Sequence, residues 1–140
     1  MLEKLGGVED QGLPTQVMLC ELIRFLEGSL ANREDGGRPR LSVVVTAWDL
    51  IDAGKFEQGP AAYLECEYPL VSGRLADLED LEVQIFGLSV VGGDLKHDPQ
   101  YRQAFLEAGL DGQGWVAISD GDGWRKDPDV TLPIAWAVGL

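Results

Sequence analysis

Polar residues follow two apolar segments of the chain, and their types suit recognition of a purine base. Asp49 follows the apolar run 41–46, and Ser89 and Val90 follow the run 83–88. A carboxylate can accept hydrogen bonds from both the ring N–H and the exocyclic amine of guanine, whereas adenine presents the opposite polarity at this edge. The Ser89 hydroxyl and the consecutive backbone N–H groups after it can meet the guanine carbonyl. Together these residues predict a pocket for guanine.

The same residues also have a purely structural interpretation. Asp49 can cap a turn or the next helix, Thr46 can simply end a strand, and residues 89–92 can form an ordinary glycine turn. Two such motifs in this order, each after a strand, favour base recognition, because ligands of open α/β sheets bind at the carboxyl ends of the strands. Both interpretations stay open from the sequence alone.

The elements that must position these residues are two strands buried on both faces and paired in parallel. The runs 41–46 and 83–88 are nearly continuous in apolar residues, which is typical of parallel strands covered on both sides. The segment 1–13 mixes glycines and charges without a period, so we expect a flexible N-terminus. Apolar spacing from Leu19 to Leu30 then predicts a helix with Thr15 as its N-cap.

Further helices are predicted between and after the two strands. Residues 61–67 have helical composition up to Pro69, and a second short helix follows around residues 71–78. Asp98 and Pro99 form an N-cap and a first helical position ahead of residues 100–108, and Gly109 ends that helix.

The C-terminal part is rich in glycine. Segments 115–118 and 130–132 flank the sequence 120–123, so we expect a hairpin or an extended loop within an insertion over residues 112–132. Pro133 then opens a final helix to Val138, in which Trp136 belongs to the core. The fold class is therefore α/β, with at least two buried parallel strands and their helices.

Length and composition favour a single domain over residues 1–140. The hydrophobic fraction of 45% argues against disorder. A net charge of −13 repels nucleic-acid phosphates and anionic lipids, so we expect neither nucleic-acid nor membrane binding. Cys20 and Cys66 form no disulfide framework, and the N-terminus has no targeting signal, which together favour the cytoplasm.

Other chemistry is poorly supported. The sequence 120–123 starts like a calcium loop, but Trp124 occupies the fifth position of that loop and Thr131 the twelfth. The single histidine, His97, stands beside charged residues before a helix, so an exposed polar role is expected. We predict no catalytic residue and no metal site.

The two strand ends resemble the base-recognition motifs of a known class of GTPases. Residues 41–52 and 85–94 are similar to the Thr/Asn-Lys-x-Asp and Ser-Ala-x motifs of translation-factor-class (TRAFAC) P-loop GTPases. The preceding helix and residues 132–136 most resemble the bacterial double-GTPase group of conflict systems. The resemblance implies part of a three-layer P-loop-GTPase-like domain that binds GDP or GTP. It also implies that Asp49 binds the guanine edge, Thr46 braces the loop, and Ser89 with the Val90 backbone completes the pocket.

The sequence departs from this pattern in three places, which limits the nucleotide binding and GTP hydrolysis that the resemblance implies. Ala47 stands where the family usually has a lysine whose stem packs over the base, and Val90 replaces a small residue. No G-x-x-x-x-G-K-[ST] sequence occurs in the 140 residues, so the phosphate and Mg²⁺ ligands of that loop are not supplied. We expect a GTPase-like domain that is not a complete GTPase alone. It would hydrolyse GTP only if the missing half, which carries the phosphate-binding loop, is supplied.

The resemblance also implies missing strands. Two parallel strands make a poor sheet, so we expect a partner chain or a second copy to complete it, unless the segment 112–132 does so internally. The alternatives are a truncated gene product, an inert protein-interaction domain that kept the scaffold, and an unrelated flavodoxin-like α/β domain whose strand ends mimic the motifs.

Overall fold

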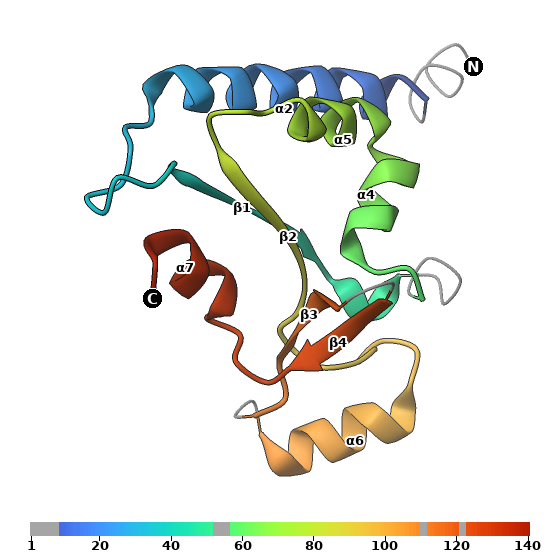
Figure 1. The fold of residues 1–140 in the computed structure, drawn as a ribbon. Coiled ribbons are helices and arrows are strands. Elements are labelled where there is room, and N and C mark those ends of the chain that lie inside the picture. Colours follow the sequence, from blue (N-terminus) through green and yellow to red (C-terminus); the bar gives the residue numbers. More distant parts are fainter. Residues whose placement is uncertain (1–8, 52–56, 110–111, 121–122) are drawn as a thin grey trace. The chain divides into compact units, whose positions relative to one another are not determined.

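A computed structural model describes residues 9–51, 57–109, 112–120 and 123–140 (Figure 1). The chain divides into two compact units. The first contains the residues up to Pro39 together with Leu64–Val83, and the second contains Arg40–Tyr63 together with Gln84–Leu140. The residues that concern the predicted guanine pocket all belong to the second unit.

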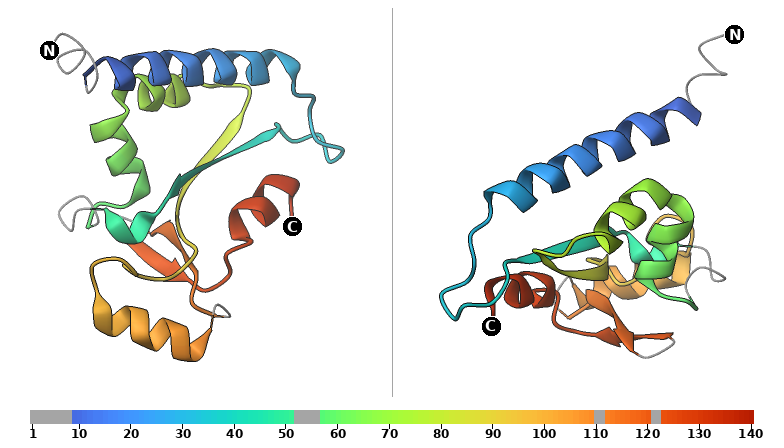
Figure 2. Two further views of the ribbon diagram at one scale, coloured as in Figure 1. Left: turned by 180° about the vertical axis from the view of Figure 1, so that it is seen from behind. Right: turned by 45° about the horizontal axis from the view of Figure 1, so that its top comes forward.

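The first unit is helical. Helix α2 (Glu9–Ser29) packs against α5 (Pro69–Ala76), and the left view of Figure 2 shows the two helices along each other. The Leu70 N–H donates to Gln16 Oε1 at 3.0 Å, and Arg74 forms an ion pair with Glu27 at 2.5 Å. Helix α4 (Pro60–Glu67) starts in the second unit and ends in the first, and it confirms the helix predicted over 61–67.

The predicted start of the first helix is wrong. Helix α2 begins at Glu9 and runs through Pro14 instead of starting after Thr15. The fixed φ of proline is compatible with a helix, although its missing N–H removes one hydrogen bond. Residues 9–13 are therefore helical, and the rest of the expected flexible segment, residues 1–8, lies outside the described residues.

The second unit is built on a four-stranded sheet with the order β1-β2-β3-β4. Strands β1 (Arg40–Thr46) and β2 (Glu82–Ser89) are parallel, which confirms the predicted pair. Strands β3 (Trp115–Asp120) and β4 (Gly123–Asp127) follow with antiparallel pairing, and the register pairs Ser89 with Trp115. The α/β fold class is thus confirmed, with the parallel strands at one side of a mixed sheet.

Two apolar clusters form the core of this unit. One consists of Trp48, Trp115 and Ala117, and the other of Phe86, Val116 and Ile118. Successive residues of β3 alternate between the clusters, because side chains of a strand point to opposite faces in turn. Helix α7 (Leu132–Val138) packs on β1, and its Trp136 is half-buried and packs against the second cluster, with its ring centroid 6.1 Å from that of Phe86.

Strand β1 is less buried than predicted. Val44 and Thr46 are exposed, and the other residues of the strand are half-buried. The expectation of two buried faces is therefore wrong for β1. The exposed Val44 and Thr46 are two residues apart and lie on the same face of the strand, so this face is the less covered one among the described residues.

The C-terminal segment forms the hairpin alternative of the prediction. The register pairs Asp120 with Gly123, so the return strand is β4 and not the predicted segment 130–132. Thr131 instead occupies the N-cap position of α7, with Pro133 near the start of the helix as predicted. Strand β3 pairs with β2, so this segment covers the edge of β2, whereas β1 stays at the edge of the described sheet.

Helix α6 (Pro99–Ala108) agrees with its sequence signals. The Asp98 side chain accepts a hydrogen bond from the Tyr101 N–H at 3.0 Å, as an N-cap does. Gly109 follows the last turn with φ 80°, a conformation that glycine adopts at low cost. No described helix is long and apolar enough to cross a membrane.

Candidate functional site

The chain turns sharply where β1 ends. Ala47 adopts the left-handed conformation, with φ 52° and ψ 41°, and the short 3-10 helix η1 (Trp48–Leu50) follows. The Leu50 N–H donates to the Ala47 carbonyl at 3.0 Å and closes the turn. Left-handed backbone costs a non-glycine residue about 1–2 kcal/mol, so the surrounding packing must hold it.

Trp48 provides that packing. Its side chain is fully buried and makes edge-on contacts with Tyr63 and Trp124, at centroid distances of 5.8 and 6.2 Å. Gly87 in β2 leaves room for the indole, because a Cβ atom there would lie 2.7 Å from the ring. The buried Trp48 therefore fixes η1 against the sheet and with it the position of the next residue, Asp49.

The loop after β2 is held by three side chains. The fully buried Ser89 accepts a hydrogen bond from the Gly92 N–H through Oγ at 2.9 Å. The Trp115 indole N–H donates to the Gly92 carbonyl at 3.1 Å, and the Tyr101 hydroxyl donates to the Val91 carbonyl. The loop is thus tied to its own strand, to β3 and to α6.

Gly92 is needed for this arrangement. It has φ 84°, and a Cβ atom at this position would lie 2.1 Å from the Gln113 carbonyl oxygen. A side chain would therefore force the loop away from the residues that hold it.

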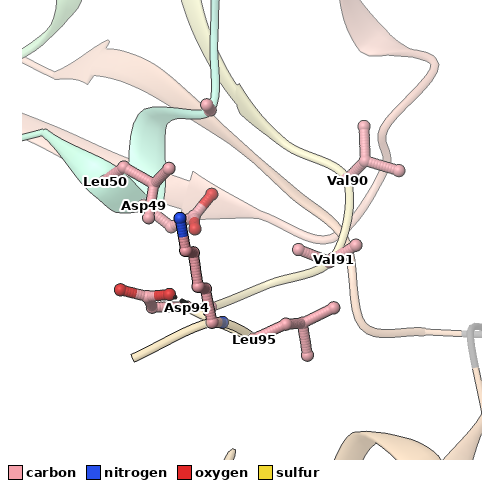
Figure 3. Close-up of a pocket in the computed structure, with 9 residues that line it drawn as sticks. Asp49, Leu50, Val90, Val91, Asp94 and Leu95 are labelled. Atoms are coloured by element: carbon pink, nitrogen blue, oxygen red, sulfur yellow. Dashed lines mark hydrogen bonds between the residues drawn. The ribbon is translucent and has the colours of Figure 1, made fainter. Parts of the chain in front are cut away.

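A cavity of about 340 Å³ opens at the carboxyl ends of β1 and β2, within the size range of small-molecule sites (Figure 3). Asp49 and Leu50 come from η1, and Val90, Val91, Asp94 and Leu95 come from the loop after β2. The complete lining is Ala47, Asp49, Leu50, Val90, Val91, Gly93, Asp94, Leu95 and Lys96. The cavity therefore joins the two predicted motifs with an apolar wall and a few charged groups.

One of its two carboxylates is engaged in hydrogen bonds. Asp94 Oδ1 accepts the Lys96 and His97 N–H groups at 2.9 and 3.0 Å, and Oδ2 lies 3.0 Å from His97 Nδ1. The hydrogen bond from the His97 backbone is the main cause that lowers the pKa of Asp94 below its usual value. Asp94 is thus an ionised group that holds the turn at the cavity rim.

The other carboxylate, Asp49, is half-buried, and its charge affects the pKa of Tyr101. Burial raises the pKa of Tyr101, and the negative charge of Asp49 raises it further. Tyr101 also donates a hydrogen bond to the carbonyl of Val91, which lines the cavity. The side chain whose pKa Asp49 raises therefore also holds part of the cavity wall.

The structure brings together two of the four predicted site residues at the cavity. Asp49 and Val90 line it, Ser89 is buried in the adjoining strand end, and the exposed Thr46 is not part of the lining. Their roles toward a ligand stay predictions. Sequence reasoning missed Trp48, Tyr101 and Lys96; the fully buried Trp48 inside the first motif is the one that a search for apolar residues beside Asp49 would have found.

The described residues contain no group of three His, Cys, Asp or Glu side chains that could hold a metal ion. The calcium-loop sequence at 120–123 falls partly on residues 121–122, which lie outside the described residues. His97 is exposed, as predicted.

The mixed sheet with its parallel strand pair is compatible with part of a P-loop-like α/β domain. The family model described as Double-GTPase 1 matches residues 2–137, so the chain belongs to this family of double-GTPase-type domains. Neither the curated proteins nor the solved structures contain a significant match to the chain.

Proposed function

We propose that the cavity binds the base of a guanine nucleotide, with Asp49 accepting hydrogen bonds from the ring N–H and the exocyclic amine. The observation that carries this proposal is the shared cavity: Asp49 from η1 and Val90 from the loop after β2 line the same space. Membership of a GTPase family supports a guanine nucleotide, GDP or GTP, as the ligand.

The other motif residues act around this contact. Ser89 holds the loop through the Gly92 N–H, so that the backbone at Val90 can meet the guanine carbonyl. Thr46 is the last residue of β1 and directly precedes Ala47, whose backbone is strained, and its proposed role is to stabilise this turn. The apolar Leu50 and Val91 border the base, because pocket walls of this kind exclude water from the polar contacts.

We further propose that these 140 residues bind without hydrolysing GTP. Phosphoryl transfer depends on a phosphate cradle and bound Mg²⁺, and the sequence holds no G-x-x-x-x-G-K-[ST] loop to supply them. Hydrolysis would then need these groups from another segment. The cytoplasm is the proposed location, since Cys20 and Cys66 are both free thiols.

Calorimetric titration with GDP and ATP tests the proposal. We expect GDP to bind at least about tenfold more tightly than ATP, because adenine cannot satisfy the Asp49 carboxylate. Asp49→Ala should remove this preference, whereas Asp80→Ala, an equal charge change at an exposed site outside the cavity, should keep it. Equal binding of ATP and GDP by the unmodified chain would refute the base pocket.

A second candidate function is a protein-interaction domain that kept the scaffold. It is favoured by the position of β1 at the end of the sheet order, where a partner chain or a second copy could add a strand. The departure at Ala47 also supports it, because that motif residue lost the side chain that normally packs over the base.

A further inference from the structure

We propose that Lys96 supplies the lysine that the first motif lacks at position 47, packing its stem over the bound base and bringing its ammonium group to the cavity. This inference rests on the proposed guanine site. It assigns the missing contact to a residue of the loop after β2, outside both recognition motifs.

Ala47 leaves this contact open. Ala47 lines the cavity, but its single methyl group cannot cover a purine ring as a lysine stem does. Its left-handed backbone keeps the turn that carries Asp49, so the loss concerns the side chain and not the geometry of the motif.

Lys96 is held where it can replace the contact. It lines the same cavity, and its backbone N–H donates to Asp94 Oδ1 at 2.9 Å. The second bond of that carboxylate oxygen, to the His97 N–H at 3.0 Å, fixes the turn around Lys96. The backbone of Lys96 is therefore held in place, while its four-carbon side chain can adjust to a ligand.

The two carboxylates in the cavity lining also favour a cation beside them. Asp49 and Asp94 both contribute carboxylates to the lining, and Lys96 is the one cation among the described lining residues. Its ammonium group makes no salt bridge with any described residue, so it is available to a ligand. A lysine over an aromatic ring is attracted to the ring face and offsets the repulsion between the two carboxylates and a phosphate-bearing ligand.

The test measures GDP and guanosine affinity by calorimetry for the unmodified chain, Lys96→Ala and Lys96→Met. We expect Lys96→Ala to weaken GDP binding about tenfold. Lys96→Met keeps a long apolar side chain without the charge, so it should weaken guanosine binding less than Lys96→Ala does. Arg24→Ala, which removes one positive charge from a side chain 74% exposed on α2, is the matched control and should bind as the unmodified chain does.

A rescue variant separates the proposed role from a general effect on folding. Ala47→Lys added to Lys96→Ala should recover most of the lost GDP affinity, because it restores the stem and the charge from the other side of the cavity. Binding of GDP by the unmodified chain together with unchanged affinity of Lys96→Ala would overturn this inference and leave the guanine site intact. Failure of the unmodified chain to bind GDP would overturn both.

Discussion

Asp94 and Asp49 line the same cavity but have different surroundings, which distinguishes a carboxylate bonded within its own turn from the carboxylate that we propose to bind the base. Asp94 receives two backbone N–H groups and faces His97, so its bonding capacity is used within the turn. No hydrogen bond from another described residue to the Asp49 carboxylate is seen. The type of residue alone could not distinguish the two, because the distinction comes from the neighbouring backbone.

The hydrogen bonds to Asp94 predict an acid-dependent contribution to stability. Its pKa is lower in the folded chain than the ordinary value of 3.8, so the folded state favours the ionised form. This contribution is complete above the unfolded pKa and is lost as the pH falls through the folded pKa. We expect the difference in urea-unfolding free energy between the unmodified chain and Asp94→Ala to shrink as the pH is lowered from 6 to below about 3.

Asp80→Ala, at an exposed carboxylate, is the control for the general effect of charge and should show no comparable change with pH. A constant difference between the unmodified chain and Asp94→Ala across this pH range would contradict the assigned hydrogen bonds.

At the level of elements, the positions of the two parallel strands could be predicted almost to the residue. Their apolar runs are bounded by Pro39 and by the polar residues at 46 and 89, and the observed strands are Arg40–Thr46 and Glu82–Ser89. The start of α2 could not be predicted in this way, because a proline normally marks the first turn of a helix and here lies inside it.

The bracing of the site depends on contacts between elements and was therefore hidden in the sequence. Tyr101 reaches the Val91 carbonyl from α6, and Trp115 reaches the Gly92 carbonyl from β3. Neither separation follows a helical or strand period, so no local pattern indicates the contact. Asp49 and Val90 were predictable because strand ends place them at the same sheet edge.

The close approach of Trp48 to β2 predicts a strong effect at Gly87. Gly87→Ala would place a Cβ atom 2.7 Å from the indole and displace η1, so we expect a loss of about 1–3 kcal/mol in unfolding free energy. Gly73→Ala is the matched control: no atom lies within 4 Å of its Cβ position in α5, and alanine favours a helix by about 0.5–1 kcal/mol. Urea unfolding monitored by tryptophan fluorescence measures both, and equal stability of the two variants would contradict the packing described for Trp48.

For the molecule as a whole, the described sheet ends in two edge strands, β1 and β4. Strand β3 pairs with β2 and so provides, within the same chain, a third strand beside the parallel pair. Strand β1 lies at one end of the order, opposite β4, and its exposed Val44 adds apolar surface there. A strand from a second copy or from a partner chain would complete the pairing of β1.

Association through β1 is tested by light scattering coupled to size-exclusion chromatography. We expect a dimer or a partner complex that Val44→Lys weakens, because a lysine on an edge strand disfavours pairing with another strand. Val130→Lys, at a similarly exposed position before α7, should leave association unchanged. A monomer that persists on concentration and in the presence of neighbouring gene products, with cooperative melting, would speak against a strand partner.

We propose that the Asp49 carboxylate recognises the guanine base, and a variant with an exchanged hydrogen-bonding pattern tests this most directly. Asp49→Asn presents an amide N–H where the carboxylate accepted a hydrogen bond, and xanthine carries a carbonyl in place of the exocyclic amine of guanine. Titration of both proteins with GDP and xanthosine diphosphate is the decisive measurement. We predict that Asp49→Asn loses at least about tenfold in GDP affinity and gains binding of xanthosine diphosphate; an unchanged preference for GDP would contradict the guanine site.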